Sequence, residues 1–106
     1  MFRIRFFFDA GSGTCFWTAN EVTREKYSYP VEPDALPIDE NLRREAIYLC
    51  AWRDTSIDWE NPAGGSPWSQ KEWELFGSKA QSFLNRVQIQ LGSQYNIFDE
   101  SKTRAT

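Results

Sequence analysis

The sequence predicts an α+β fold in which a small, mostly antiparallel sheet packs against two or three helices. Apolar residues alternate with other residues along 2–8, which is the period of a strand with one buried face. Apolar residues recur at helical spacing along 70–91, which predicts a long amphipathic helix. Strands near both ends, helices between them and no regular strand–helix alternation favour α+β over a parallel α/β sheet.

The first third of the chain predicts a β-hairpin and a short helix. The strand at 2–8 is followed by turn-forming residues and then by a β-branched and aromatic run at 14–17. Asn20 is a suitable N-cap for a short helix over 21–28. This helix must stop near Pro30, because the residue before a proline disfavours helical geometry. Three prolines within 30–38 then indicate an extended connector.

Two longer helices and a last strand follow. Asp39 is a plausible N-cap for a helix over 40–54, and one face of this helix is apolar. Ser69 and Glu72 have the spacing of a capping box at the start of the helix over 70–91. The apolar face of the first helix comprises Leu42, Ala46, Leu49, Cys50 and Arg53. That of the second comprises Trp73, Phe76, Ala80, Phe83, Leu84, Val87 and Leu91.

Two glycines have different predicted roles in the long helix. Gly77 lies on its apolar face, and we interpret it as a point of close approach for another backbone. Gly92 is a natural C-terminal stop. Residues 95–98 have strand character and are expected to pair with the strand at 2–8. The predicted domain therefore spans residues 1–98, followed by a flexible tail over 99–106.

The amino-acid composition excludes several kinds of catalytic and metal site and disfavours some partners. The 106 residues carry a formal net charge of −3 and contain no histidine. The missing histidines exclude Ser-His-Asp triads, Cys-His dyads and most zinc sites, so we expect no metal and no cofactor. A mildly acidic chain is poorly suited to nucleic acid and well suited to a basic protein partner. No stretch is long enough to span a membrane, and the short apolar run ending at Asp9 does not make a signal peptide, so a cytoplasmic protein is expected.

The residues with the strongest binding character lie at the end of the first long helix and in the irregular stretch 54–68. Tryptophan and tyrosine are enriched in protein interfaces, and acidic neighbours would attract a basic partner such as a nuclease domain; the resemblance described below extends this to a basic toxin. Whether Trp59 and Trp68 are surface or core residues stays open at this point, because five tryptophans in a small protein can all be buried. The predicted partner-binding residues are Tyr48, Trp52, Asp54, Asp58, Trp59, Glu60 and Trp68.

Other function classes remain open. A small enzyme could use the carboxylates of Asp54, Asp58 and Glu60, or the thiol of Cys15. The chain could also be a phage-type inhibitor of a host defence protein. A structural protein that associates with itself through exposed aromatic residues is the remaining alternative, and the sequence leaves the oligomeric state undecided.

Several segments carry a resemblance to known proteins. They are Arg5 to Trp17, Tyr29-Pro30-Val31, Ala51 to Trp59, and Ser66-Pro67-Trp68-Ser69. Together they resemble a group of small bacterial proteins of unassigned function. In size and acidity the chain is also similar to immunity proteins that neutralise bacterial toxins. This second resemblance implies a non-enzymatic inhibitor that occludes its partner at a fixed stoichiometry.

Overall fold

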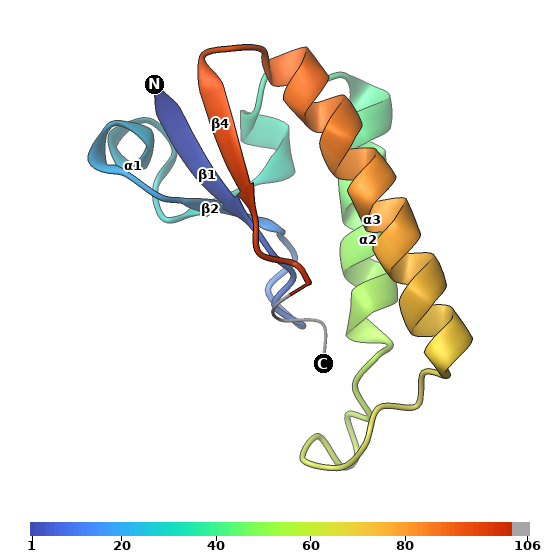
Figure 1. The fold of residues 1–106 in the computed structure, drawn as a ribbon. Coiled ribbons are helices and arrows are strands. Elements are labelled where there is room, and N and C mark those ends of the chain that lie inside the picture. The colour runs from blue at the N-terminus through green and yellow to red at the C-terminus, as the bar shows by residue number, and fades with distance from the viewer. Residues whose placement is uncertain (103–106) are drawn as a thin grey trace.

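A four-stranded sheet packs against a pair of long helices in the structure, a computed structural model that describes residues 1–102 (Figure 1). The elements in chain order are β1 (Phe2–Phe6), β2 (Phe16–Thr18), α1 (Glu21–Tyr27), β3 (Pro30–Val31), the 3-10 helix η1 (Pro33–Ala35), α2 (Glu40–Asp54), α3 (Gln70–Leu91) and β4 (Tyr95–Asp99). The predicted α+β class is therefore confirmed.

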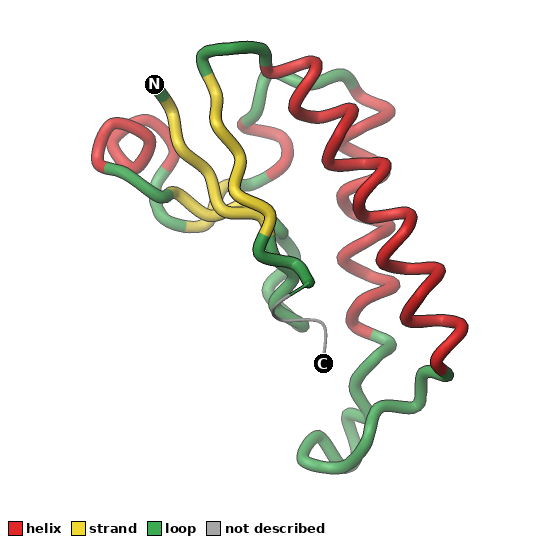
Figure 2. The backbone as a smooth tube through the Cα atoms, in the orientation of Figure 1, coloured by secondary structure: helices red, strands yellow, loops and turns green. Residues whose placement is uncertain are grey.

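The sheet has the strand order β3-β2-β1-β4. β2 runs antiparallel to both β1 and β3, which confirms the hairpin and the mostly antiparallel character. β4 pairs with β1 as predicted, and it does so in parallel, with Phe2 opposite Tyr95 and Ile4 opposite Ile97. The chain makes this parallel pairing possible because α3 carries it back to the end of the sheet where β1 begins (Figure 2).

The N-terminal strand is shorter than predicted, and the connector after α1 is more regular. β1 ends at Phe6, although Phe7 and Phe8 are also buried. Phe7 stacks on Trp17 with ring centroids 4.8 Å apart, whereas the Phe8 ring meets Phe76 of α3 at 4.9 Å. Phe7 and Phe8 are therefore both buried by other aromatic side chains, although the strand ends at Phe6. The predicted connector at 30–38 contains β3 and η1.

The core lies between the sheet and the α2–α3 pair. Phe6, Phe16 and Phe83 are fully buried at its centre, with ring centroids about 6 Å apart. The apolar faces predicted for the two long helices point into this core, since every predicted residue except Trp73 is buried and Trp73 packs against it as a half-buried side chain. The core therefore fixes both helices against the sheet.

The helix boundaries follow the predicted caps. Asn20 and Asp39 accept hydrogen bonds from Thr23 N and Leu42 N, and Ser69 Oγ accepts one from Glu72 N at 3.1 Å. Gly92 ends α3 with φ of +80°, a left-handed conformation that favours glycine. Glu72 does not complete the reciprocal half of a capping box, because its carboxylate accepts a hydrogen bond from Trp52 Nε1 at 2.9 Å.

Asp39 also joins the start of α2 to the end of α3. Its N–H donates to Gln90 Oε1 at 2.8 Å, and Gln90 Nε2 donates to its carboxylate at 2.6 Å. The hydrogen bond from Leu42 N–H and the bond from Gln90 hold the pKa of Asp39 below its ordinary value of 3.8. A carboxylate with a lowered pKa stabilises the folded state above that ordinary value, and the stabilisation is lost as pH falls through the lowered pKa.

The variant Asp39→Asn tests this link, because asparagine keeps the cap acceptor and removes the charge. We expect the variant to melt at a lower temperature than the native chain at neutral pH. The difference should close as the pH falls from 3.8 through the lowered pKa of Asp39, because the native carboxyl then becomes protonated. Thermal unfolding followed by circular dichroism over this pH range measures the effect. A difference that stays constant down to low pH would contradict the role given to the charge.

The interpretation of Gly77 is wrong. A Cβ added at this position would meet nothing within 4 Å among residues 1–102, so no backbone of that part of the chain approaches the helix closely there. Glycine in a helix interior costs about 1 kcal/mol relative to alanine. We therefore expect Gly77→Ala to raise the free energy of unfolding by about 1 kcal/mol, measured by urea denaturation. An unchanged or lowered value would show that this position needs glycine after all.

The last strand is one residue longer than the strand predicted at 95–98. Asp99 is the last residue of β4, and Glu100 forms a two-point ion pair with Arg5, whose Nε lies 2.7 Å from Glu100 Oε2. Residues 99 and 100 are thus held beside β1 in the structure. The rest of the tail prediction, from residue 103 onward, lies outside the described residues. None of the helices within residues 1–102 is long and apolar enough to cross a membrane.

Candidate protein-binding surface

The residues predicted to bind a partner lie along the C-terminal half of α2 and in the loop that joins it to α3. This loop projects beyond the ends of both helices, at the bottom of Figure 1. The structure does not bring all seven side chains onto one surface. It separates them into a groove between the helices, an acidic surface on the loop, and a buried tryptophan.

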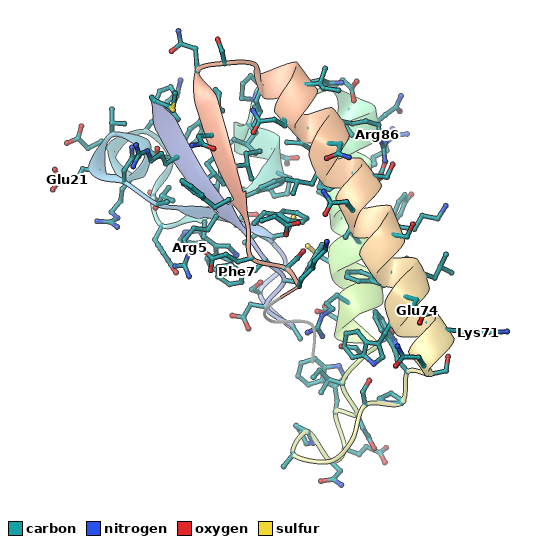
Figure 3. The ribbon with its side chains drawn as sticks, in the orientation of Figure 1. Arg5, Phe7, Glu21, Lys71, Glu74 and Arg86 are labelled. Atoms are coloured by element: carbon teal, nitrogen blue, oxygen red, sulfur yellow. The ribbon has the colours of Figure 1, made fainter. Side chains whose placement is uncertain are left out.

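Tyr48 and Trp52 line a shallow groove between α2 and α3. Tyr48 is 70% exposed, whereas Trp52 is half-buried and packs edge-on against Phe76 with ring centroids 5.0 Å apart. Glu45 and Arg86 also line the groove and form a two-point ion pair, in which Arg86 nitrogens lie 2.5 and 2.7 Å from Glu45 oxygens. Arg86 projects outward from α3 in Figure 3.

Asp54 connects the end of α2 to the turn between β1 and β2. Its Oδ1 accepts a hydrogen bond from Gly11 N at 2.8 Å. Gly11 has φ of +88°, which favours glycine, and a Cβ there would lie 3.6 Å from the Trp59 ring. The backbone oxygen of Asp54 accepts a hydrogen bond from Trp59 Nε1 at 3.0 Å. The turn and the loop thus hold the indole between them.

Trp59 is nevertheless a surface residue, since 57% of it is exposed. Asp58 and Glu60 flank it and are exposed, and Asp58 Oδ1 accepts a hydrogen bond from Glu60 N at 3.1 Å, which fixes the local turn. Asp9 is also exposed and belongs to the turn that Asp54 binds. These residues, Asp9, Asp54, Asp58, Trp59 and Glu60, are called the acidic tip below.

The sequence interpretation did not include Asp9 or Gly11 in the site. The turn sequence Asp-Ala-Gly-Ser-Gly predicts a tight turn. It does not predict which other segment the turn contacts. The contact between Gly11 and Asp54 joins residues 43 positions apart. Local sequence patterns carry no information about such a contact.

Trp68 belongs to the core, which settles the question the sequence left open. Only 8% of it is exposed, and its ring lies 4.7 Å from that of Trp73 and 5.2 Å from that of Phe76. Its Nε1 donates a hydrogen bond to Thr55 Oγ1 at 2.9 Å. Trp68 therefore offers little surface to a partner in the folded chain and packs with the core.

The burial of Cys15 argues against the alternative in which its thiol is catalytic. The residue is 0% exposed, and burial raises the pKa of its thiol well above the ordinary value, with a hydrogen bond to Cys50 adding to the rise. Because the thiolate is the reactive form, a thiol of this kind is inert at neutral pH. Within residues 1–102 no group of three metal-ligating side chains is close enough to hold a metal ion.

A thiol-labelling experiment checks this conclusion. We expect a disulfide reagent such as dithionitrobenzoate to react with neither Cys15 nor Cys50 in the native chain, because both are buried. Both should react rapidly once denaturant is added, and this second reaction is the control. Fast labelling of Cys15 under native conditions would reopen the thiol-enzyme alternative.

Comparison with known proteins supports one of the function classes that the sequence left open. A family model described as Serratia CdiI immunity protein-like matches residues 3–101. The chain belongs to this family. A search of the curated proteins finds no match. The likeness to immunity proteins expected from size and acidity is therefore confirmed at the level of the family.

Membership of the CdiI-like family supports a toxin-neutralising role with a protein partner, and it suggests a non-enzymatic one. The match covers nearly the whole described chain, including the β1–β2 turn, α2 and the loop. The acidic tip is therefore part of the matched region.

Proposed function

We propose that this CdiI-like chain neutralises a basic toxin, such as a nuclease domain, by stoichiometric binding through its acidic tip. The observation that carries this proposal is the exposed Trp59 indole, which donates a hydrogen bond to the Asp54 backbone oxygen and is flanked in sequence by the exposed Asp58 and Glu60. An ordered aromatic side chain loses little conformational freedom on binding, which is why such residues dominate interface energetics.

The charges at the tip suit a partner that acts on nucleic acid. Such a partner needs a positively charged surface to hold phosphates. Carboxylates at Asp58 and Glu60 would attract that surface during the encounter and occupy it afterwards, which would exclude the substrate. The mechanism requires no chemistry from the immunity protein. Tyr48 and Trp52 lie on the neighbouring groove and would extend the contact along α2.

We place this encounter in the cytoplasm. Cys15 and Cys50 are free and buried in the structure. Free thiols are usual in the reducing cytoplasm, where disulfides seldom persist. The cytoplasm is also where a nuclease would meet its substrate.

A titration with the cognate toxin tests the proposal. Purified toxin should lose its activity in proportion to the added immunity protein and should be fully inhibited at one equivalent. The complex should be recovered intact by size-exclusion chromatography. Complete inactivation by a small fraction of an equivalent would instead indicate an enzyme that modifies the toxin. Binding without any loss of toxin activity would contradict occlusion.

A further inference from the structure

The groove between α2 and α3 has a shape that fits a third helix. Its volume is about 370 Å³, and it follows the line of contact between two antiparallel helices that lie side by side (Figure 1). On each helix, three lining residues recur at the spacing i, i+3, i+7, which is the spacing of residues that face a partner helix in a coiled coil. These residues are Glu45, Tyr48 and Trp52 on α2, and Lys79, Ser82 and Arg86 on α3.

A helix suits this groove better than an extended segment does. Both walls are helices, whose backbone N–H and C=O groups are bonded within each helix. These walls offer no row of donors and acceptors to an added strand, whose own backbone groups would then be covered without partners. A helix satisfies its backbone groups internally and presents side chains at the same spacing as the walls. The groove therefore favours a helical partner segment.

The part of the groove beside Tyr48 is apolar. Leu49 is buried and lies at its base, Trp52 is half-buried, and the ring of Tyr48 is exposed. The indole N–H of Trp52 is already bonded to Glu72, so Trp52 contributes its apolar ring to the groove. Apolar side chains that cover these two rings would remove apolar surface from water on both partners. One face of the bound helix is therefore expected to be apolar.

Lys79 adds positive charge to the same groove. Glu45 and Arg86 form an ion pair with each other, so their charges offset. Lys79 is exposed, and it forms no ion pair with any other residue of 1–102. A carboxylate on the bound helix would be complementary to this ammonium group. The groove thus attracts negative charge, whereas the acidic tip attracts positive charge.

We propose that this groove receives an amphipathic helix of the toxin, with apolar side chains against Tyr48 and Trp52 and a carboxylate against Lys79. The inference rests on the proposed function and adds a second contact, of opposite charge, to the contact at the acidic tip. Trp52 and Asp54 lie at the same end of α2, so one toxin surface can reach both. A toxin that must present a basic surface beside an acidic helix is distinguished from other basic proteins.

Charge reversal at Lys79 tests the proposal against a matched control. Lys79→Glu and Lys71→Glu each replace one positive charge by one negative charge, which moves the formal net charge from −3 to −5. Both lysines are exposed on α3, and only Lys79 lines the groove. Net charge alone would make both variants bind a basic toxin more tightly.

We expect Lys79→Glu to bind the purified toxin about tenfold more weakly than the native chain, because close like charges then oppose binding. Lys71→Glu should bind at least as tightly as the native chain. Isothermal titration calorimetry measures both affinities, and native melting temperatures establish that both variants fold. Equal affinities of the two variants would overturn the proposal.

A photochemical cross-link identifies the segment that occupies the groove. Replacement of Tyr48 by p-azidophenylalanine keeps the aromatic ring and adds a small photoreactive group at an exposed position. Irradiation of the complex with purified toxin should capture a toxin segment with apolar residues at i, i+3 or i+4, and i+7 and with an aspartate or glutamate among them, as mass spectrometry would show. A captured segment without this pattern, or no captured toxin, would contradict the proposal. Capture of a second copy of the chain would also contradict it, since the groove would then join two copies.

The outcomes for the two proposals are distinguishable. If the native chain does not inhibit the toxin, the proposed function fails and the groove proposal fails with it. If inhibition depends on Asp58 and Glu60 but Lys79→Glu binds as Lys71→Glu does, only the groove proposal fails.

Discussion

The double variant Asp58→Lys, Glu60→Lys is expected to bind the toxin about a hundredfold more weakly than the native chain and to fold normally. Both carboxylates flank the exposed Trp59 indole in sequence, which places them at the centre of the proposed interface. Close charge pairs in protein interfaces contribute about 1.5–7 kcal/mol, and a loss of about 3 kcal/mol corresponds to about a hundredfold in affinity. Isothermal titration calorimetry with the purified toxin measures the change.

Two control variants separate the effect of the Asp58 and Glu60 carboxylates from a change in net charge and from a change in the local turn. The double reversal moves the formal net charge from −3 to +1, and Glu25→Lys, Glu32→Lys produces the same net charge at exposed positions away from the tip. This control should retain most of the affinity. Asp58→Asn, Glu60→Gln keeps an acceptor for the turn bond to Glu60 N and removes only the charge, so it should lie between the native chain and the reversal.

Salt provides an independent measure of the same interaction. Exposed charges are screened over about 8 Å at physiological ionic strength. The native association rate should therefore fall as salt is added, and that of the lysine double variant should not. If the lysine double variant binds the toxin as tightly as the native chain does, the binding surface is not the acidic tip. The groove at Tyr48 is then the next candidate.

Patterns within one element predicted most of the fold. The caps at Asn20, Asp39 and Ser69 and the periodic apolar residues are local features, and they gave the three helices to within one residue. The direction of β4 is not a local feature. Whether Tyr95 to Asp99 runs parallel or antiparallel to β1 depends on where α3 places the chain, and that depends on packing over the whole core.

The site was predicted less completely, for the same reason. The acids and aromatic residues were identified by type, but their division between surface and core depends on contacts distant in sequence. Trp59 is exposed because the Gly11 turn and Asp54 hold it at the edge of the molecule. Trp68 is buried because α2 and α3 bring Trp52, Trp73 and Phe76 around it. Nothing in the two local sequences distinguishes these outcomes.

Replacement of Trp68 by alanine is expected to lower the free energy of unfolding by about 3–5 kcal/mol, the usual cost of deleting a large aromatic side chain from a core. The change removes ring contacts to Trp52, Trp73 and Phe76 and leaves Thr55 Oγ1 without its donor. Because domains of this size are stable by only about 5–15 kcal/mol, the variant is close to unfolding. Urea denaturation of the isolated chain measures the loss, and Trp68→Phe, which keeps most of the packing, should lose much less.

Trp59→Ala is the matched control, since it deletes the same side chain from an exposed position nine residues away. Its free energy of unfolding should change by less than about 1 kcal/mol. Its affinity for the toxin should nevertheless fall by about 2 kcal/mol or more, the threshold for an interface hot spot. The two tryptophans are thus expected to give opposite results in the two assays. A large loss of stability for Trp59→Ala, or a small one for Trp68→Ala, would contradict the division into a core and a binding residue on which the proposed function rests.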